Sequence, residues 1–220
     1  MNIKNNILKE KLKNVYFIAG TNCGGKSSMA KSLSEKFDMI FYCADDNYWN
    51  HRKYSTIKDQ PNMNRKFLGW DEFFNREIED KTNWLLESEL EEMDFIIMDL
   101  VQLAQKEDQK VIVDVHCMPE ILKQVSEYNR VIFLLADPEV VFNEYFERDD
   151  KLDVYNCILQ NTTDPKQSIL HSRKVARRIA SIETKKALNS GFKYLLRTES
   201  TDFLDRQKLV IEHFGLQENK

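Results

Sequence analysis

Three of the six glycines in this chain lie within six positions, at Gly20, Gly24 and Gly25, and a lysine and two serines follow them. The segment GTNCGGKS fits the pattern G-x-x-x-x-G-K-[ST] and lies between an apolar run and a stretch with helical spacing, as a phosphate-binding loop requires. In such a loop, backbone N–H groups and the positive end of the following helix point at the oxygens of a polyphosphate. The pattern therefore predicts that the chain binds ATP or GTP through Gly20, Thr21, Asn22, Cys23, Gly24, Gly25, Lys26, Ser27 and Ser28.

Lys26 and Ser27 are the residues of this loop whose side chains carry chemistry of their own. The charge of the lysine suits the β and γ phosphates, and the serine hydroxyl is placed to bind Mg²⁺. Asp114 ends the apolar run KVIVD, as in a Walker B segment, and could hold Mg²⁺ through water or contact the substrate. We therefore predict ATP and Mg²⁺ as cofactors, with Lys26 in catalysis and Ser27 and Asp114 at the metal. His116 and Cys117 are interpreted as pocket lining.

Two further carboxylates, Asp45 and Asp46, follow the apolar run MIFYCA. Ligands of open α/β sheets bind at the carboxyl ends of the strands, so both aspartates are candidates for contact with a substrate. A carboxylate there could accept the proton of a substrate hydroxyl or hold that hydroxyl in line with the γ phosphate. One of the two is also expected to lie in a helix cap or turn.

Five apolar runs are typical of buried parallel strands, because they are continuous rather than alternating. They cover residues 15–20, 39–44, 110–116, 130–136 and 192–197. Helical spacing predicts helices over residues 26–37, 70–106, 119–128, 138–148, 166–189 and 203–214. A capping box, Ser88-x-x-Glu91, predicts a break in the longest of these near Ser88, and Gly191 is a candidate C-terminal cap. The alternation of strands and helices predicts an α/β fold.

Composition narrows the class of protein further. A chain of 220 residues with 42% hydrophobic residues can bury the core of one domain, which we assign to residues 1–220. The 32 Lys and Arg against 36 Asp and Glu leave no basic excess, so nucleic acid is not a favoured partner. No run is long enough to span a membrane, and the apolar stretch at 15–19 is too short for a signal peptide. The four cysteines are widely separated, which argues against a zinc site or disulfides and favours the cytoplasm.

On these features the chain resembles the superfamily of nucleoside, nucleotide and shikimate kinases, whose relatives include gluconate kinases and chloramphenicol phosphotransferase. The resemblance rests on GTNCGGKS, on the acids at the ends of the second and third strands, on Arg148, and on the arginine-rich segment SRKVARRIAS. It implies a three-layer P-loop fold with a five-stranded parallel sheet in the order 2-3-1-4-5, flanked by helices. It also implies a substrate-binding insert at about 47–87 and a lid at about 149–170. Residues 149–165 lose periodicity, as a mobile lid would.

The same resemblance implies roles for single residues. It favours Asp45 as the catalytic carboxylate, with Asp46 beside it in substrate binding. It implies that Arg148 and one or two of three later arginines clamp the phosphates as charge develops. Arg177 is the catalytic candidate among those three, which are Arg173, Arg177 and Arg178.

The expected insert is rich in aromatic residues and arginines. Aromatic faces stack on a flat ring, and arginines bind phosphate or carboxylate through two parallel hydrogen bonds. Arg65 and Trp70 are therefore candidate substrate residues, together with Asp114. Most of the aromatics, including Phe73, Phe74 and Trp84, have helical spacing typical of the insert's own core.

Other P-loop classes lack their motifs here. The chain has no N-K-x-D segment of GTPases and no S-G-G-Q segment of ABC ATPases. It also lacks D-G-x-P-R of adenylate-kinase-like enzymes and D-R-[YH] or E-R-S of deoxynucleoside kinases. We expect a monomeric or homodimeric small-molecule kinase, with a nucleoside-like acceptor slightly ahead of other hydroxylated metabolites. An antibiotic phosphotransferase and a nucleotide-binding regulatory module without turnover are the alternatives.

Overall fold

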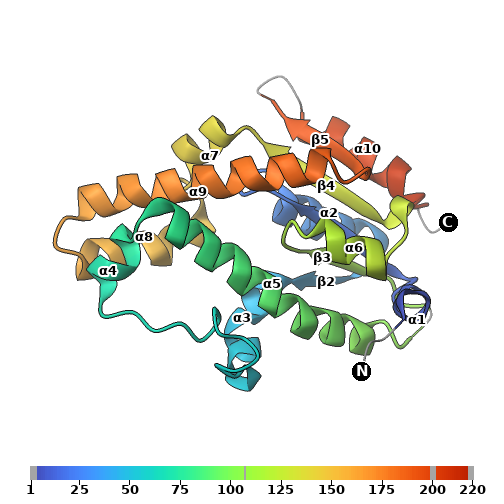
Figure 1. Ribbon diagram of the computed structural model, residues 1–220. Coiled ribbons are helices and arrows are strands. Elements are labelled where there is room, and N and C mark those ends of the chain that lie inside the picture. The colour runs from blue at the N-terminus through green and yellow to red at the C-terminus, as the bar shows by residue number, and fades with distance from the viewer. Residues whose placement is uncertain (1–3, 107, 199–201, 218–220) are drawn as a thin grey trace.

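All five expected strands form and pair in one parallel sheet. In the computed structural model, which describes residues 4–106, 108–198 and 202–217, they are β1 (Val15–Gly20), β2 (Ile40–Cys43), β3 (Val111–Asp114), β4 (Val131–Ala136) and β5 (Lys193–Arg197). Their order across the sheet is β2-β3-β1-β4-β5, which confirms the order 2-3-1-4-5 (Figure 1). β1 pairs with β3 on one side and β4 on the other, so the P-loop leaves the middle of the sheet.

The helices connect the strands and cover both faces of the sheet. They are α1 (Asn5–Lys11), α2 (Lys26–Phe37), α3 (Ala44–Tyr54), α4 (Trp70–Asn75), α5 (Ile78–Leu103), α6 (Pro119–Val125), α7 (Pro138–Glu144), α8 (Leu152–Asn161), α9 (Pro165–Leu188) and α10 (Phe203–Phe214). Short 3₁₀ turns, η1 (Tyr128–Arg130) and η2 (Asp149–Lys151), precede β4 and α8. The C-cap of α9 is Asn189, and Gly191 takes a positive φ of 81° later in the turn to β5.

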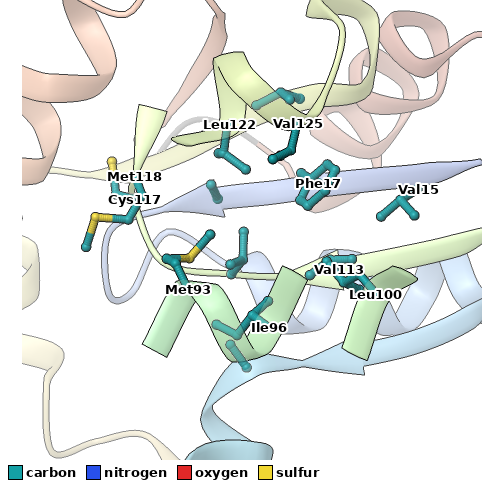
Figure 2. Packing of buried hydrophobic residues seen from close by; sticks show 14 of the residues in the cluster. Val15, Phe17, Met93, Ile96, Leu100, Val113, Cys117, Met118, Leu122 and Val125 are labelled. Atoms are coloured by element: carbon teal, nitrogen blue, oxygen red, sulfur yellow. The ribbon is translucent and has the colours of Figure 1, made fainter. Parts of the chain in front are cut away.

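Alternate residues of the strands enter two separate cores. Val15 and Phe17 of β1 pack with residues of α5 and α6, as Figure 2 shows, whereas Tyr16 and Ile18 pack with residues of α2 and α10. Because both faces are covered, every residue of β1 and β4 is buried. This explains why these strands read as continuous apolar runs. The result is a three-layer α/β/α arrangement.

The predicted break near Ser88 is wrong, because α5 runs through this position without interruption. Ser88 is buried, and its hydroxyl lies 3.0 Å from the Tyr48 hydroxyl, so it ties α5 to α3 instead of capping a helix. The break lies between α4 and α5. There Glu77 is the N-cap, and its carboxylate accepts a hydrogen bond from the Asp80 N–H at 2.9 Å.

The predicted loss of regular structure over 149–165 is also wrong. Residues 152–161 form helix α8, whose apolar positions include Tyr155 and Ile158, and Ile158 is fully buried. α8 packs against α4 and α9, and Thr163 donates hydrogen bonds to the Asp71 carboxylate from its N–H at 2.8 Å and its hydroxyl at 2.6 Å. The segment is therefore a helix held against α4 and α9, and its action as a lid stays a prediction.

Candidate functional site

Close contact between the P-loop and β4 requires two of the loop glycines. A Cβ added at Gly20 would lie 2.1 Å from the Leu134 carbonyl oxygen, and one added at Gly24 would lie 2.3 Å from the same atom. Gly20 also has a φ of +131°, which L side chains rarely adopt. Gly25 has a φ of +87° and is the N-cap of α2. The glycines predicted from sequence to cradle phosphate thus also permit the loop to lie against the backbone of β4.

Polar contacts fix the rest of the loop. Thr21 donates its N–H to the Leu134 carbonyl at 3.2 Å and accepts the Ala136 N–H on its hydroxyl at 2.7 Å. Two C-terminal arginines hold loop carbonyls: Arg197 donates to Cys23 O at 3.0 Å, and the buried Arg206 donates to Gly24 O at 2.9 Å. The two arginines therefore fix the carbonyls of Cys23 and Gly24 from outside the loop.

Lys26, Ser27 and Asp114 meet at the start of α2. The Lys26 ammonium donates to the Thr21 carbonyl at 3.2 Å, so it bends back over the loop. The Ser27 hydroxyl donates to Asp114 Oδ2 at 2.5 Å, and Asp114 is buried at the end of β3. The structure thus brings together the lysine and the two residues predicted to hold a metal.

A cavity of about 580 Å³ opens above the loop. Its walls carry Asp45 and Asp46 opposite the P-loop residues, and its remaining sides come from α7, η2 and Arg197. Both aspartates are in the first turn of α3, where the positive end of the helix favours them, and both are exposed to solvent. One of these aspartates was expected in a helix cap or turn, and both lie in the first turn of α3. They also line the cavity opposite the P-loop.

Asp45 is surrounded by positive charges. The protein atoms around its carboxyl would by themselves raise its pKa, but the charges of His116, Lys151, Lys26 and Arg148 lower the pKa below its usual value. Asp45 is therefore ionised at neutral pH and can accept a hydrogen bond. Lys151 belongs to η2, so the segment predicted as a lid already places a cation near this carboxylate.

Arg148 reaches the P-loop from the end of the α7 region. Its Nη1 donates to Asn22 Oδ1 at 2.8 Å, and its Nε and Nη2 donate to the two carboxylate oxygens of Asp150 at 2.9 and 2.7 Å. It also lines the cavity. The structure thus brings this predicted arginine next to the phosphate-binding loop.

The arginines of α9 lie in different surroundings. Arg177 donates to Glu139 at 3.0 Å and lines a second cavity with Arg178, which is paired with Glu79 at 2.8 Å. Arg177 is not among the described residues that line the cavity over the P-loop. Arg173 lies on the same face of α9 as Ala176 and Ala180, which pack with Cys23. The Nε atom of Arg173 is buried and has no hydrogen-bond partner among the described residues.

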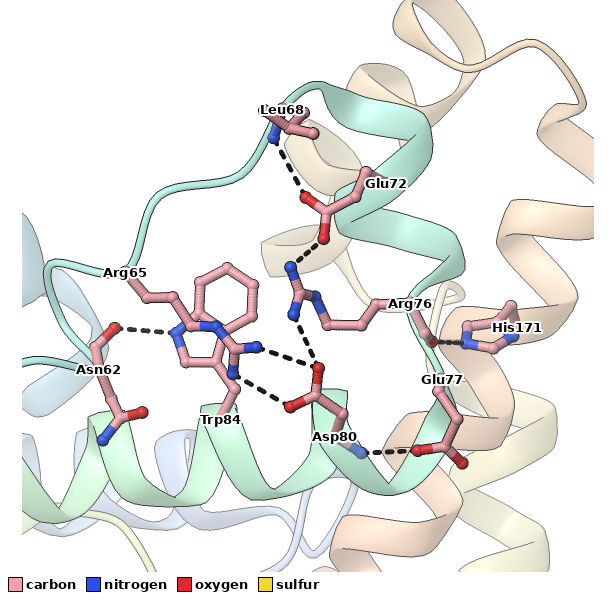
Figure 3. A network of polar contacts seen from close by, with 9 residues as sticks. All are labelled: Asn62, Arg65, Leu68, Glu72, Arg76, Glu77, Asp80, Trp84 and His171. Atoms are coloured by element: carbon pink, nitrogen blue, oxygen red, sulfur yellow. Dashed lines mark hydrogen bonds and ion pairs between the residues drawn. The ribbon is translucent and has the colours of Figure 1, made fainter.

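The structure does not bring Arg65 and Trp70 to the P-loop cavity. Figure 3 shows that Arg65 forms two hydrogen bonds with the Asp80 carboxylate, at 3.1 and 3.0 Å, while its guanidinium covers the Trp84 ring. Trp70 contacts other aromatic rings of the insert, namely Phe67, Phe73 and Phe74. Both residues build the insert's own packing, as helical spacing indicated for its other aromatics.

Sequence reasoning missed a buried group of charged residues at the end of β3. Nε2 of His116 donates to Glu92 Oε2 at 3.1 Å, and its Nδ1 lies 3.9 Å from Glu89 Oε1. Glu183 joins this group from α9. In sequence, ESELEE resembles a solvated helix face, and only the packing of α5 on α9 shows otherwise. Burial alone would lower the pKa of His116, but the carboxylates of Glu89 and Glu92 raise it to about 10, so the imidazole is an imidazolium.

No model of a known protein family matches the chain, and no curated protein is similar to it in sequence. Solved structures with a similar backbone include shikimate kinase from Acinetobacter baumannii, at 15% identity and a TM-score of 0.47 over 90% of each chain. Shikimate kinase from Bacteroides thetaiotaomicron has 16% identity and a TM-score of 0.46 over 92% of this chain and 98% of its own. Dephospho-CoA kinase from Campylobacter jejuni has 13% identity and a TM-score of 0.41 over 90% of this chain and 94% of its own.

The superfamily that the sequence resembles includes shikimate kinases, and shikimate kinases are among these structures. The comparisons identify no particular protein. At such low identities the function has to be argued from the residues of the site. Among the described residues, no helix is both long and apolar enough to cross a membrane.

Proposed function

We propose that this chain is an ATP- and Mg²⁺-dependent kinase that transfers the γ-phosphoryl group to a hydroxyl of a small molecule, nucleoside-like or otherwise. The observation that carries this proposal is that one cavity holds the P-loop, the Asp45 carboxylate and the Arg148 guanidinium. Phosphoryl transfer needs little covalent chemistry from a protein, and it depends on positioning and charge stabilisation. These residues supply both.

The donor side is ready to take a polyphosphate. Lys26 bonds a neutral backbone carbonyl, so phosphate oxygens can replace that partner without leaving a buried charge unpaired. Mg²⁺ prefers oxygen ligands and takes only one or two from the protein when phosphates and water supply the rest. Ser27 and Asp114, whose oxygens are 2.5 Å apart, fit that demand and would hold the ion. When bound, Mg²⁺ neutralises charge on the phosphates.

On the acceptor side, the ionised Asp45 accepts a hydrogen bond from the substrate hydroxyl and orients it toward the γ phosphorus. As the new P–O bond forms and the bond to the β–γ bridging oxygen breaks, the hydroxyl proton moves to this carboxylate. Because the pKa of Asp45 is low, its main contribution is orientation, with proton transfer late in the step. Arg148 stabilises the charge on the transferred group, and Arg173 is the α9 arginine best placed to assist.

Two measurements test the proposal in sequence. Calorimetric titration with ATP and Mg²⁺ should show binding that Lys26→Ala removes. A coupled ADP-release assay should then show turnover with some member of a panel of nucleosides, sugars and chloramphenicol, which also separates the antibiotic phosphotransferase alternative. A chain that binds ATP but releases ADP with none of a broad panel would support the regulatory module, and a chain that binds no ATP would overturn the P-loop assignment.

A further inference from the structure

Glu89 of α5, whose side chain is 26% exposed, and the buried Glu183 of α9 lie on two helices that pack against each other. Helices α5 and α9 pack through Leu86 and Ile179 among others. Glu89 follows Leu86 by one helical turn and Glu183 follows Ile179 by one turn, so both continue the same contact face. His116 lies 3.9 Å from Glu89, and the Cys117 thiol donates to the Glu183 carbonyl at 3.4 Å. Both glutamates therefore converge at the end of β3.

Each of these two glutamates has an oxygen without a partner. Glu183 is only 5% exposed, and its Oε2 accepts no hydrogen bond from any described residue. The Oε2 atom of Glu89 is likewise buried and unbonded within the described part of the chain. Such groups are costly to bury, because they lose water and gain nothing in return. Two of them at one place, on two different helices, indicate that a ligand supplies the missing donors.

The neighbouring cations are already engaged. His116 bonds Glu92, whose other oxygen accepts His51 Nδ1 at 2.7 Å, so this imidazolium has one carboxylate partner before Glu89 is counted. Lys26 lies on the phosphate side of the site and bonds Thr21. The described residues contain no group of three or more His, Cys, Asp or Glu side chains that could hold a metal ion. An ammonium group of an organic molecule would supply the missing donors to both oxygens.

We propose that the acceptor carries a protonated amine, which Glu89 and Glu183 bind while its hydroxyl is held by Asp45. An ammonium has three N–H donors and no acceptor, so it can bond both free carboxylate oxygens at once. Cys43 of β2 pairs with Asp114 of β3, so Asp45 and His116 each follow paired residues by two positions at the same sheet edge, and His116 lies 3.9 Å from Glu89. The inference rests on the proposed kinase function and narrows its substrates to amino alcohols with an aliphatic amine, such as amino sugars and nucleosides with an amino group on the sugar.

Burial and the facing charge of Glu89 raise the pKa of Glu183 to about 8, and burial also raises the pKa of Glu89. Without ligand, Glu183 therefore retains a proton at neutral pH. An arriving ammonium stabilises the ionised carboxylates, so its binding releases protons to solvent.

The test compares acceptors that differ in the amine. The full chain with ATP and Mg²⁺ is assayed for ADP release, with the phosphorylated product identified by mass, on D-glucosamine against D-glucose and on 3′-amino-3′-deoxyadenosine against adenosine. Shikimate serves as an anionic acceptor. We expect kcat/KM to be about tenfold to a hundredfold higher for an amine-bearing member than for its partner, as for hydrogen bonds between charged groups.

Matched variants assign the preference to the carboxylates. Glu183→Gln and Glu89→Gln keep side-chain size and remove the charge, so the amine preference should fall about tenfold or more while ATP affinity is unchanged. Glu79→Gln is the control, because Glu79 lies on the same helix α5 but is exposed and pairs with Arg178. Bound ATP in each variant, measured by calorimetry, shows that it is folded.

The outcomes separate this inference from the proposed function. A preference for glucose, adenosine or shikimate in the wild type overturns the inference but leaves the kinase intact. The same holds if the amine preference survives in both Gln variants, since the two carboxyls would then form a structural pair that shares a proton. ATP binding with no turnover of either amine also overturns it. Absence of ATP binding instead defeats the proposed function.

Discussion

The two sides of the cavity are built in different ways. The phosphate side uses nine consecutive residues, 20–28, whose backbone is fixed by contact with β4. The proposed acceptor side has Asp45 in the cavity wall, and the charged residues Glu89, His116 and Glu183 lie on other elements beyond the cavity lining. The first side is therefore sensitive to changes in shape, whereas the second is sensitive to changes in charge that leave shape alone.

The largest loss of activity is expected on replacing Lys26, which is the charged residue within the loop 20–28. Lys26→Ala should lower phosphoryl transfer by about a thousandfold or more, the scale for loss of a key group that stabilises the transition state. Thermal unfolding should change little, because the ammonium bonds only a carbonyl of its own loop among the described residues. Lys208→Ala, at an exposed position of α10, is the matched control. Wild-type turnover in the Lys26 variant would contradict the P-loop assignment.

Asp45→Asn tests charge on the acceptor side at constant shape. We expect kcat to fall about a hundredfold, the usual scale of general-base loss, while the Kd for ATP barely moves. Asp46→Asn is the control, because Asp46 lines the same cavity on the same helix turn. If only the Asp46 variant loses activity, the two roles are exchanged.

Replacing Arg148 and Arg177 in turn compares an arginine next to the P-loop with an arginine in the second cavity. Arg148→Ala should lower kcat about tenfold to a hundredfold and raise the Kd for ATP less, because the charge that it meets is largest in the transition state. Arg177→Ala should stay within about twofold of wild type, since the guanidinium pairs with Glu139 in another cavity. Steady-state kinetics and ATP titration measure both quantities. A large loss of kcat at Arg177 would mean that α9 moves toward the phosphates during turnover.

Gly24→Ala tests shape on the phosphate side without changing charge. The new methyl group would lie 2.3 Å from the Leu134 carbonyl oxygen, so the loop or β4 must shift. We expect the free energy of unfolding to fall by about 1–3 kcal/mol, as for overpacked sites, with weaker ATP binding. Gly69→Ala is the control, because a Cβ there meets nothing within 4 Å. Chemical denaturation measures the difference, and equal stability of the two variants would show that the loop is adaptable.

The smallest effect concerns the pH dependence of stability. The pKa of Glu183 is about 8 in the folded chain and near 4.5 in the unfolded chain, so between these values the folded state binds more protons. Stability contributed by the protonated carboxyl is therefore complete below pH 4.5 and is lost as the pH rises through about 8. Glu183→Gln should flatten the decline in melting temperature from pH 5 to 8. A variant with the same slope as wild type would show that Glu183 titrates normally.

The strands and the P-loop were predictable because their signals are local, whereas the sheet order followed only from the resemblance to a kinase superfamily. Continuous apolar runs locate the strands, and GTNCGGKS places the loop at the end of the first of them. α8 was missed because its Asn and Thr residues resemble a loop, although Tyr155 and Ile158 follow helical spacing. The helix break predicted near Ser88 was wrong because the pattern Ser-x-x-Glu also occurs within helices. Here the Ser88 hydroxyl contacts the Tyr48 hydroxyl of α3.

The acceptor side was predictable only in part. Asp45 follows a strand directly, so its position at the sheet edge could be inferred. Glu89 and Glu183 are separated by 94 positions in sequence and meet only because α5 and α9 pack together. A single sequence contains no signal for such a contact. Arg65 and Trp70 were wrongly expected at the substrate because their residue types suit ligands. In the structure Arg65 binds Asp80 and Trp70 stacks on Phe74, so both contacts stay within the insert.

The bonds from Arg197 and Arg206 to the P-loop carbonyls have a consequence for how the protein is made. The loop is synthesised well before the two arginines that hold its carbonyls, because each arginine follows its partner by 174 or 182 positions. A nascent chain therefore carries the motif long before it has the finished nucleotide site. Because ATP stabilises only chains that can bind it, the cellular pool of ATP should favour completed molecules over truncated ones.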